Sequence, residues 1–265
     1  MVASARSIGI IGGSGMLGGA MSRTLLDRKI VPASDFWISS RSGSRAGFEQ
    51  YPEMKVTRDN TELGAACEVI ILCVPPALAP EISIHVPGRL VVSVMAGIPL
   101  NIVEELTGSD RVVRAMSSPA AAIGLAYSPW IASPKIDSAD RARVTEIFQA
   151  CGSTDEIEDE THLDHFTALT GPVPGFVAFY AECMIDYAVK AGISPTMADR
   201  AVRQLFLSAG AVMAHSNATP SDQVQEMIDY AGTTAAGLLV MKNSSIADAI
   251  AEGLDAAVAK ARKLG

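Results

Sequence analysis

A glycine-rich turn near the N-terminus constrains the fold of this chain more than any other feature. A short apolar run, Ile8 to Ile11, predicts a buried strand, and helical spacing of apolar residues follows from Met16 to Asp27. Between them lies Gly13-x-Gly15-x-x-Gly18. In such a loop the first glycine permits the tight turn, the second lets the backbone approach a diphosphate, and the third lets helix and strand pack closely. The sequence therefore predicts a strand, turn and helix that bind a dinucleotide.

The backbone N–H groups that open this helix lack partners within the helix, so they are free to face phosphates. The alternative is a glycine-rich turn that holds no ligand, but its position between a strand and a helix favours the dinucleotide. The predicted cofactor-binding residues of the loop are Gly13, Ser14, Gly15, Met16, Leu17 and Gly18.

The end of the second predicted strand, Phe36 to Ser39, indicates which dinucleotide is bound. A site that prefers NADH places an Asp or Glu about 20 residues beyond the loop, where it accepts hydrogen bonds from the ribose. This chain has no acid there and instead has Ser40, Arg41 and Ser42. A guanidinium flanked by hydroxyls suits a 2′-phosphate, so we predict NADPH, with NADH possible. The alternative is that Arg41 and the nearby Arg45 are only solvated loop charges.

The first half of the chain alternates strands with helices, which predicts a Rossmann-type, doubly wound parallel sheet. Ligands of such sheets bind at the carboxyl ends of the strands. Apolar runs at 69–74 and 90–94 predict two of these strands. The cofactor-binding residues predicted at their ends are Val74, Pro75, Ala96 and Gly97.

The second half of the chain has an almost entirely helical pattern from Leu163 onward. We predict an α/β dinucleotide-binding domain over residues 1–161 and an all-α domain over residues 162–265. The helices of this domain are expected at 175–190, 195–214, 221–229, 233–242 and 246–264. The stretch from Gly175 to Val189 is too apolar for a solvated helix, which predicts a homodimer or larger homo-oligomer formed through this domain.

Composition excludes several classes of function. The net charge of −8 and the pI of about 5.0 argue against a general nucleic-acid binder. We find no apolar stretch long enough to span a bilayer, and thus expect no membrane partner. The four cysteines lack metal or disulfide spacing, which predicts a soluble cytoplasmic protein. His162 and His165 have no third ligand at a suitable spacing, so no metal site is predicted.

Five motifs together indicate a family. They are Ile8-Gly9-Ile10-Ile11-Gly12 with Met16, Val91 to Ile98, Arg114-x-Met116, Thr167-Ala168-Leu169-Thr170-Gly171 with Pro174, and Gly232-Thr233-Thr234-x-x-Gly237-Leu238. Through these motifs the chain resembles pyrroline-5-carboxylate reductases over nearly its whole length. The resemblance implies an NADPH-binding domain followed by a helical dimerisation domain, and the reduction of a small-molecule substrate, a cyclic imine acid, to proline.

Three segments depart from the family's pattern. Ser117-Ser118 replaces Pro-Asn, residues 170–176 differ from Ser-Gly-Ser-Gly-Pro-Ala-Tyr, and Asp229 to Ala231 replace Ser-Pro-Gly. These segments surround the imine acid in the family. The architecture therefore resembles the family while the substrate pocket is altered. The Gly-Gly-Ser-Gly loop also resembles deazaflavin-dependent NADP reductases, which we interpret as convergence of the loop.

The substrate site is predicted from chemistry and from the resemblance together. A carboxylate is well held by the free N–H groups of a helix start, which Ala231, Gly232 and Thr233 supply. Thr233 and Thr234 are the predicted catalytic residues, and by resemblance Thr234 hydrogen-bonds the ring nitrogen. The alternative is that both threonines only cap the helix. The predicted substrate-binding residues are Ser118, Gly171, Ala231 and Gly232.

Other functions remain open at this point. A reductase of a different imine or keto acid fits the altered pocket. A β-hydroxyacid dehydrogenase would carry a catalytic Lys on the long helix that follows the first domain, paired with an upstream Asn. The helix from Gly175 has no Asn, and its one Lys, Lys190, lies at its end. A catalytically silent NADP-binding redox sensor is the alternative from another class.

Overall fold

The computed structural model describes residues 7–171 and 173–264. The chain forms two compact units. The first unit contains the described residues up to 171 together with 255–264, and the second contains residues 173–254. The predicted domain boundary between residues 161 and 162 stays a prediction.

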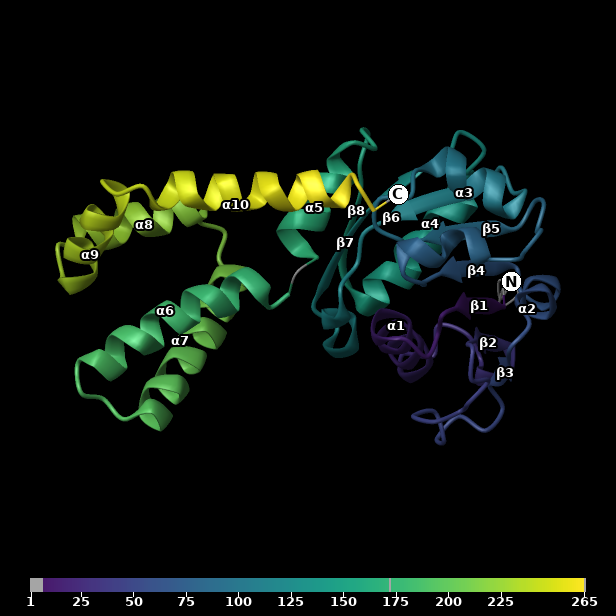
Figure 1. Ribbon diagram of the computed structural model, residues 1–265, viewed down its shortest axis with the longest axis horizontal. Coiled ribbons are helices and arrows are strands. Elements are labelled where there is room, and N and C mark those ends of the chain that lie inside the picture. Colours follow the sequence, from purple (N-terminus) through teal and green to yellow (C-terminus); the bar gives the residue numbers. More distant parts are fainter. Residues whose placement is uncertain (1–6, 172, 265) are drawn as a thin grey trace. The chain divides into compact units, whose positions relative to one another are not determined.

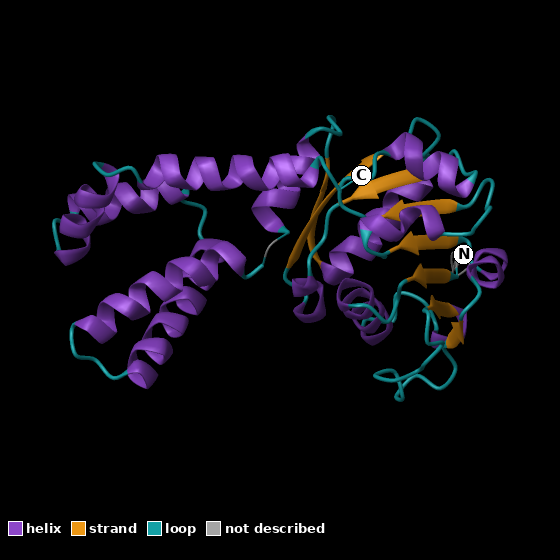
Figure 2. Ribbon diagram, in the orientation of Figure 1, coloured by secondary structure: helices purple, strands orange, loops and turns teal. Residues whose placement is uncertain are grey.

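The first unit is built on an eight-stranded sheet in the order β3-β2-β1-β4-β5-β6-β7-β8, which Figure 2 shows as orange arrows. Every neighbouring pair is parallel except β6 and β7. The central strands β1, β4 and β5 are buried along their whole length. The strands are β1 (Ile8–Ile11), β2 (Phe36–Ser39), β3 (Lys55–Thr57), β4 (Val69–Leu72), β5 (Leu90–Ser93), β6 (Val112–Ala115), β7 (Ala126–Ala132) and β8 (Gly152–Glu156).

Helices cover both faces of this sheet, as predicted for a doubly wound fold (Figure 1). Leu25 and Phe148, from α1 and α4, lie in one buried apolar cluster. Leu63 and Val103, from α2 and α3, lie in another. The helices of this unit are α1 (Met16–Asp27), α2 (Asn60–Ala66), α3 (Leu100–Thr107), α4 (Ser138–Cys151) and α5 (His162–Thr170).

The predicted doubly wound parallel sheet is confirmed, with one departure that the sequence did not indicate: β7 runs antiparallel to β6. The connection between the two strands holds only the short 3₁₀ helix η3 (Pro119–Ile123). Strands join in parallel through a long crossover, usually a full helix, whereas a short connection returns the chain antiparallel. The next connection contains α4, and β8 is accordingly parallel to β7.

A buried ion pair fastens α4 to the sheet. Both oxygens of the fully buried Asp140 carboxylate accept hydrogen bonds from Arg111, at 3.0 Å from Nε and 2.5 Å from Nη2. These bonds raise the pKa of the Arg111 guanidinium. We expect Asp140→Asn to lower the free energy of unfolding by about 2 kcal/mol, because it leaves a partly buried cation without its counter-charge. Urea denaturation measures this change.

An exposed ion pair in the same unit provides the control. Arg141 Nε lies 3.0 Å from Glu156 Oε1, and both side chains are more than a third exposed. Glu156→Gln is expected to change the free energy of unfolding by less than about 0.5 kcal/mol. Equal losses in the two variants would contradict the role given to Asp140.

The second unit contains apolar helices whose side chains are largely exposed in the single chain. No residue of α6 is buried, and the side chain of Phe179 is 65% exposed. Monomeric proteins rarely leave so much contiguous apolar surface in water. The helices are α6 (Gly175–Lys190), α7 (Pro195–His215), α8 (Pro220–Asp229), α9 (Thr233–Lys242) and α10 (Ile246–Ala261), of which α10 passes into the first unit at residue 255.

The prediction that no stretch of the chain is long and apolar enough to cross a membrane is wrong by length and composition alone. The stretch His162–Lys190 passes that test, which is weak evidence for a membrane span. In the structure this stretch contains two separate helices, α5 and α6.

Candidate dinucleotide-binding site

The turn after β1 is made by two adjacent glycines. The N–H groups of Gly12 and Gly13 both donate to the carbonyl of Ser39, at the end of β2. Gly12 has the left-handed φ of +83°, and a Cβ built on it would lie 2.3 Å from the carbonyl oxygen of Cys73. The tight turn, assigned to Gly13 from the sequence, therefore falls at Gly12. Gly13 instead packs against Ile38, where a Cβ would approach the side chain to 2.6 Å.

The N-terminus of α1 is open to an anion. Its N-cap is Gly15, which has no side chain that could cap the helix, and the first turn contains no acidic residue. The first N–H groups of a helix have no partner within the helix, and the helix dipole favours negative charge beside them. Gly18 lies against the turn, since its Cβ would be 2.3 Å from the Gly12 carbonyl oxygen. Gly18 thus permits the close packing of helix and turn that the sequence predicts for the third glycine, and diphosphate binding at this helix start stays a prediction.

A cleft of about 350 Å³ lies beside this turn, at the carboxyl ends of β1, β2 and β4. It brings together six of the predicted cofactor-binding residues: Ser14, Gly15, Ser40, Arg41, Val74 and Pro75. The other predicted cofactor-binding residues are outside its lining: Gly13, Met16, Leu17, Gly18, Ser42, Ala96 and Gly97. Met16 is 79% exposed, whereas Ala96 and Gly97 follow β5, farther along the sheet.

The turn after β2 has the polar groups expected for a phosphate. Ser40 Oγ accepts from the N–H of Gly43 at 3.2 Å and lies 3.4 Å from Ser42 Oγ, so the two hydroxyls are held together. Arg41 is exposed and has no ion pair among the described residues. Arg45, in contrast, donates from Nη1 to the carbonyl of Tyr51 at 2.8 Å, so its guanidinium braces the loop. The alternative of a purely solvated loop charge is therefore wrong for Arg45, whereas for Arg41 the binding of the 2′-phosphate stays a prediction.

The polar residues of the cleft that sequence reasoning missed include Arg58 and Asn60. Asn60 Oδ1 accepts a hydrogen bond from Ser39 Oγ at 2.7 Å, which ties the start of α2 to the end of β2. The signal that points to both is the short strand β3. Its parallel pairing with β2 places the residues that follow it at the same edge of the sheet as Ser40 and Arg41.

Cys73 also lines the cleft, but its thiol is not a nucleophile at neutral pH. Burial raises the pKa of this thiol to about 12. A thiol with a pKa raised this far stays protonated at neutral pH, whereas the thiolate is the reactive form. The residue therefore contributes apolar surface beside the turn.

The motif Arg114-x-Met116 meets α5 in the first unit. The guanidinium of Arg114, which is buried, lies 2.9 Å from Glu160 Oε1 and 3.0 Å from Asp164 Oδ1. Met116 Sδ accepts from the hydroxyl of Thr167, and a Cβ on Gly171 would lie 2.6 Å from Met116 Cε. Two motifs that are far apart in the sequence are therefore in contact. Ser118, two residues after Met116, is the N-cap of η3 and is buried.

The predicted substrate residues of the second unit lie at the start of α9. Gly232 is the N-cap, and Thr233 and Thr234 are the first two helical residues. No side chain caps this helix, and its first turn contains no acid. Ala231 takes the left-handed φ of +56°, which only a few per cent of residues other than glycine adopt. The alternative in which the threonines cap the helix is wrong, because Gly232 is the N-cap and no side chain makes a capping hydrogen bond. Both threonines are exposed residues.

Each half of the chain matches a family of known proteins. Residues 160–264 match the family described as pyrroline-5-carboxylate reductase dimerisation. Residues 7–97 match the family of NADP oxidoreductases, coenzyme F420-dependent. The likeness to deazaflavin-dependent reductases thus extends beyond the loop on which we noted it.

Relatives match along the full length of the chain. A pyrroline-5-carboxylate reductase from Synechocystis is 26% identical, over 97% of this chain and 98% of the relative. The structure of a 1-pyrroline-5-carboxylate reductase from Streptococcus pyogenes is 26% identical, with a TM-score of 0.83 over 98% of this chain and 100% of that one. A pyrroline-5-carboxylate reductase from Coxiella burnetii shares the fold at 21% identity, with a TM-score of 0.89 over 99% of both chains. The chain is thus similar along its full length to proteins named pyrroline-5-carboxylate reductases, and its residues 160–264 match their dimerisation family.

Proposed function

We propose that this protein is an NADPH-dependent reductase that transfers a hydride to the C=N bond of a cyclic imine acid and converts pyrroline-5-carboxylate to proline. The observation that carries the proposal is the full-length match to proteins named for this reaction, over 97% of this chain and 98% of the relative. The open helix start at α1 and the guanidinium of Arg41 support NADPH as the reductant.

Each part of the candidate site has a role in this reaction. The N-terminus of α1 binds the diphosphate of the cofactor, and Arg41 with Ser40 and Ser42 binds its 2′-phosphate. The bound nicotinamide supplies the hydride, so the protein needs little acid or base chemistry of its own. Its main contribution is to hold the imine carbon in position.

Residues at the start of α9 are proposed to hold the substrate. The backbone N–H groups that follow Gly232 bind the carboxylate, because the helix has neither a side-chain cap nor an acid in its first turn. The hydroxyl of Thr234 hydrogen-bonds the ring nitrogen, which gains a proton from water as the neighbouring carbon takes the hydride from the nicotinamide. Ser118 and Gly171 stay predicted substrate residues of the first unit.

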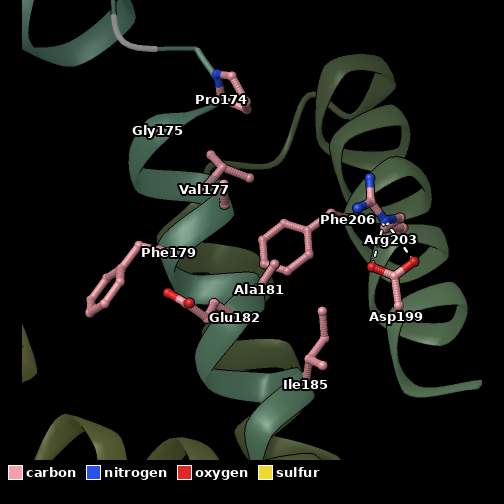
Figure 3. Close-up of a pocket in the computed structure, with 11 residues that line it drawn as sticks. Pro174, Gly175, Val177, Phe179, Ala181, Glu182, Ile185, Asp199, Arg203 and Phe206 are labelled. Carbon is pink, nitrogen blue, oxygen red and sulfur yellow. Dashed lines mark hydrogen bonds and ion pairs between the residues drawn. The ribbon is translucent and has the colours of Figure 1, made fainter. Parts of the chain in front are cut away.

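We further propose that the protein is a homodimer or larger homo-oligomer formed through the helical unit. A cavity of about 690 Å³ between α6 and α7 is mostly apolar in its lining. Figure 3 shows Phe206 directed from α7 toward α6, with the pair Arg203 and Asp199 beside it. The match of this region to a dimerisation family supports a second copy of the chain as the occupant of the apolar faces.

The oligomer can be tested with a single charge. Phe179→Glu should shift the protein toward the monomer in analytical ultracentrifugation, because it places a carboxylate on the apolar face of α6. A charge change on the exposed surface of α3, Glu105→Lys, serves as the control and should leave the oligomer intact. A wild-type monomer across micromolar concentrations would contradict the proposal.

The state of the cysteines indicates the cellular compartment in which the protein works. The four thiols, of Cys67, Cys73, Cys151 and Cys183, are free. Unpaired cysteines are typical of reducing compartments, which supports the cytoplasm as the proposed location.

The reaction is tested by following the loss of NADPH absorbance when pyrroline-5-carboxylate is added. A six-membered cyclic imine acid and an open-chain keto acid, assayed in parallel, test the alternative substrates. Turnover that is fastest with pyrroline-5-carboxylate would support the proposal. Turnover only with another substrate, or NADPH binding without any turnover, would overturn it, and the latter would favour a redox sensor.

A further inference from the structure

The cleft contains a second guanidinium that the function described above does not use. Arg58 follows β3 directly and lines the cleft together with Arg41. In the parallel register, Ser39 of β2 pairs with Thr57 of β3, and the N–H of Ser40 donates to the carbonyl of Thr57 at 3.2 Å. Arg41 and Arg58 therefore leave adjacent strands from one edge of the sheet.

The stem of Arg58 is held against the turn that contains Arg41. A Cβ built on Gly43 would lie 2.7 Å from Arg58 Cγ and 3.1 Å from its Cδ, so the methylene groups pack on the open face of this glycine. Gly43 has a φ of +61° and is itself fixed by hydrogen bonds to Ser40. This packing restricts where the guanidinium can reach, although the side chain is exposed.

The acidic side chains near Arg58 form no ion pair with it within the described part of the chain. The Asp59 carboxylate accepts from the N–H of Thr61 and caps α2. The Glu62 carboxylate accepts from the hydroxyl of Thr57 at 2.5 Å. Glu81, at the end of the 3₁₀ helix η2 (Pro76–Glu81), lines the same cleft but forms no ion pair with either arginine within the described part of the chain. The two guanidiniums thus add unneutralised positive charge to one corner of the cleft.

We propose that Arg58 is a specificity-determining residue that binds the 2′-phosphate of NADPH together with Arg41. This inference rests on the proposed function, whose cofactor it specifies further. A phosphate monoester carries close to two negative charges at neutral pH and three acceptor oxygens, so it can engage two arginines at once. NADH has only a hydroxyl at this position and gains nothing from the second guanidinium.

Binding constants of the full-length protein test the proposal without turnover. The dissociation constants of NADPH and NADH are measured by nicotinamide fluorescence for the wild type, Arg58→Ala and Arg41→Ala. Arg58→Ala should weaken NADPH binding about tenfold and leave NADH binding within about twofold, because the loss is that of a charge-assisted hydrogen bond. Arg58→Lys should restore part of the loss, since lysine keeps the charge but not the planar fork.

Arg45→Ala is the matched control, because this arginine lies in the same loop but donates to the Tyr51 carbonyl. Its ratio of NADPH to NADH affinity should equal that of the wild type. Competition by adenosine 2′,5′-bisphosphate and by 5′-AMP isolates the 2′-phosphate, and only the bisphosphate should lose affinity in Arg58→Ala.

Two results would overturn the role of Arg58. Equal weakening of NADPH and NADH would mean that Arg58 contacts a part common to both, such as the adenine or the diphosphate. Unchanged binding of both would mean that it contacts neither. A protein that binds NADPH in the expected way but does not reduce pyrroline-5-carboxylate would refute the proposed reaction alone and leave Arg58 in its role.

Discussion

Gly12→Ala is expected to weaken NADPH binding about 100-fold, because the change displaces the turn that positions the N-terminus of α1. The new methyl group would lie 2.3 Å from the carbonyl oxygen of Cys73, which is backbone and cannot rotate away. The φ of +83° adds a cost of about 1 kcal/mol for any residue with a Cβ. Fluorescence titration with NADPH measures the affinity.

Gly88→Ala separates the two causes. Gly88 has a similar φ of +73°, but a Cβ built on it meets nothing within 4 Å. It should lower the free energy of unfolding by about 1 kcal/mol and leave NADPH affinity unchanged. Near-native NADPH affinity in a folded Gly12→Ala protein would show that the turn does not position the cofactor.

Thr234→Val is expected to lower kcat/KM for pyrroline-5-carboxylate about 100-fold, because it removes a hydroxyl proposed to hydrogen-bond the reacting nitrogen while preserving the shape of the side chain. The change should leave α9 intact, since the N-cap is Gly232 and no side chain caps the helix. NADPH affinity should stay at the wild-type value. Steady-state kinetics with both substrates varied give these quantities.

Thr233→Val is the matched comparison, one residue earlier on the same helix. It should reduce kcat/KM less than Thr234→Val, and Thr234→Ser should recover much of the activity because it restores the hydroxyl. Activity of Thr234→Val within about twofold of the wild type would reject the role given to Thr234. A larger loss in Thr233→Val would transfer that role to its neighbour.

Local patterns were sufficient to predict much of the fold. The bounds of β1, α1, α6 and α9 agree with those expected from apolar spacing and from the residues that break it. Such features are encoded within a dozen neighbouring residues. The direction of a strand is not encoded in this way. β7 is antiparallel because only a short connection separates it from β6, and the expected alternation of strand and helix did not reveal this.

Within the cofactor cleft, the sequence predicted the loop and Arg41 but missed Arg58. Arg41 follows a clear strand at a known distance from the glycines, whereas Arg58 follows β3, a strand of only three residues. The contact between Arg58 and Gly43 depends on how β2 and β3 pair. Position in a sheet, rather than spacing in the chain, places this arginine in the cleft.

Long-range contacts were also beyond the sequence. Arg114 and Met116 were noticed as a motif, but their partners on or before α5 lie about 50 residues later in the chain. The bonds from Arg114 to Glu160 and Asp164 explain why a cation suits the end of β6. These ion pairs indicate a structural role for Arg114, which the motif alone does not reveal.

The most direct test of the proposed reaction uses NADPH labelled with deuterium at both C4 positions. The purified protein is incubated with this cofactor and pyrroline-5-carboxylate, and the product is analysed by NMR and mass spectrometry. Hydride transfer to the imine should give proline with one deuterium, located at C5, the carbon of the former C=N bond. Absence of proline, or proline without deuterium at C5, would contradict hydride transfer to this imine.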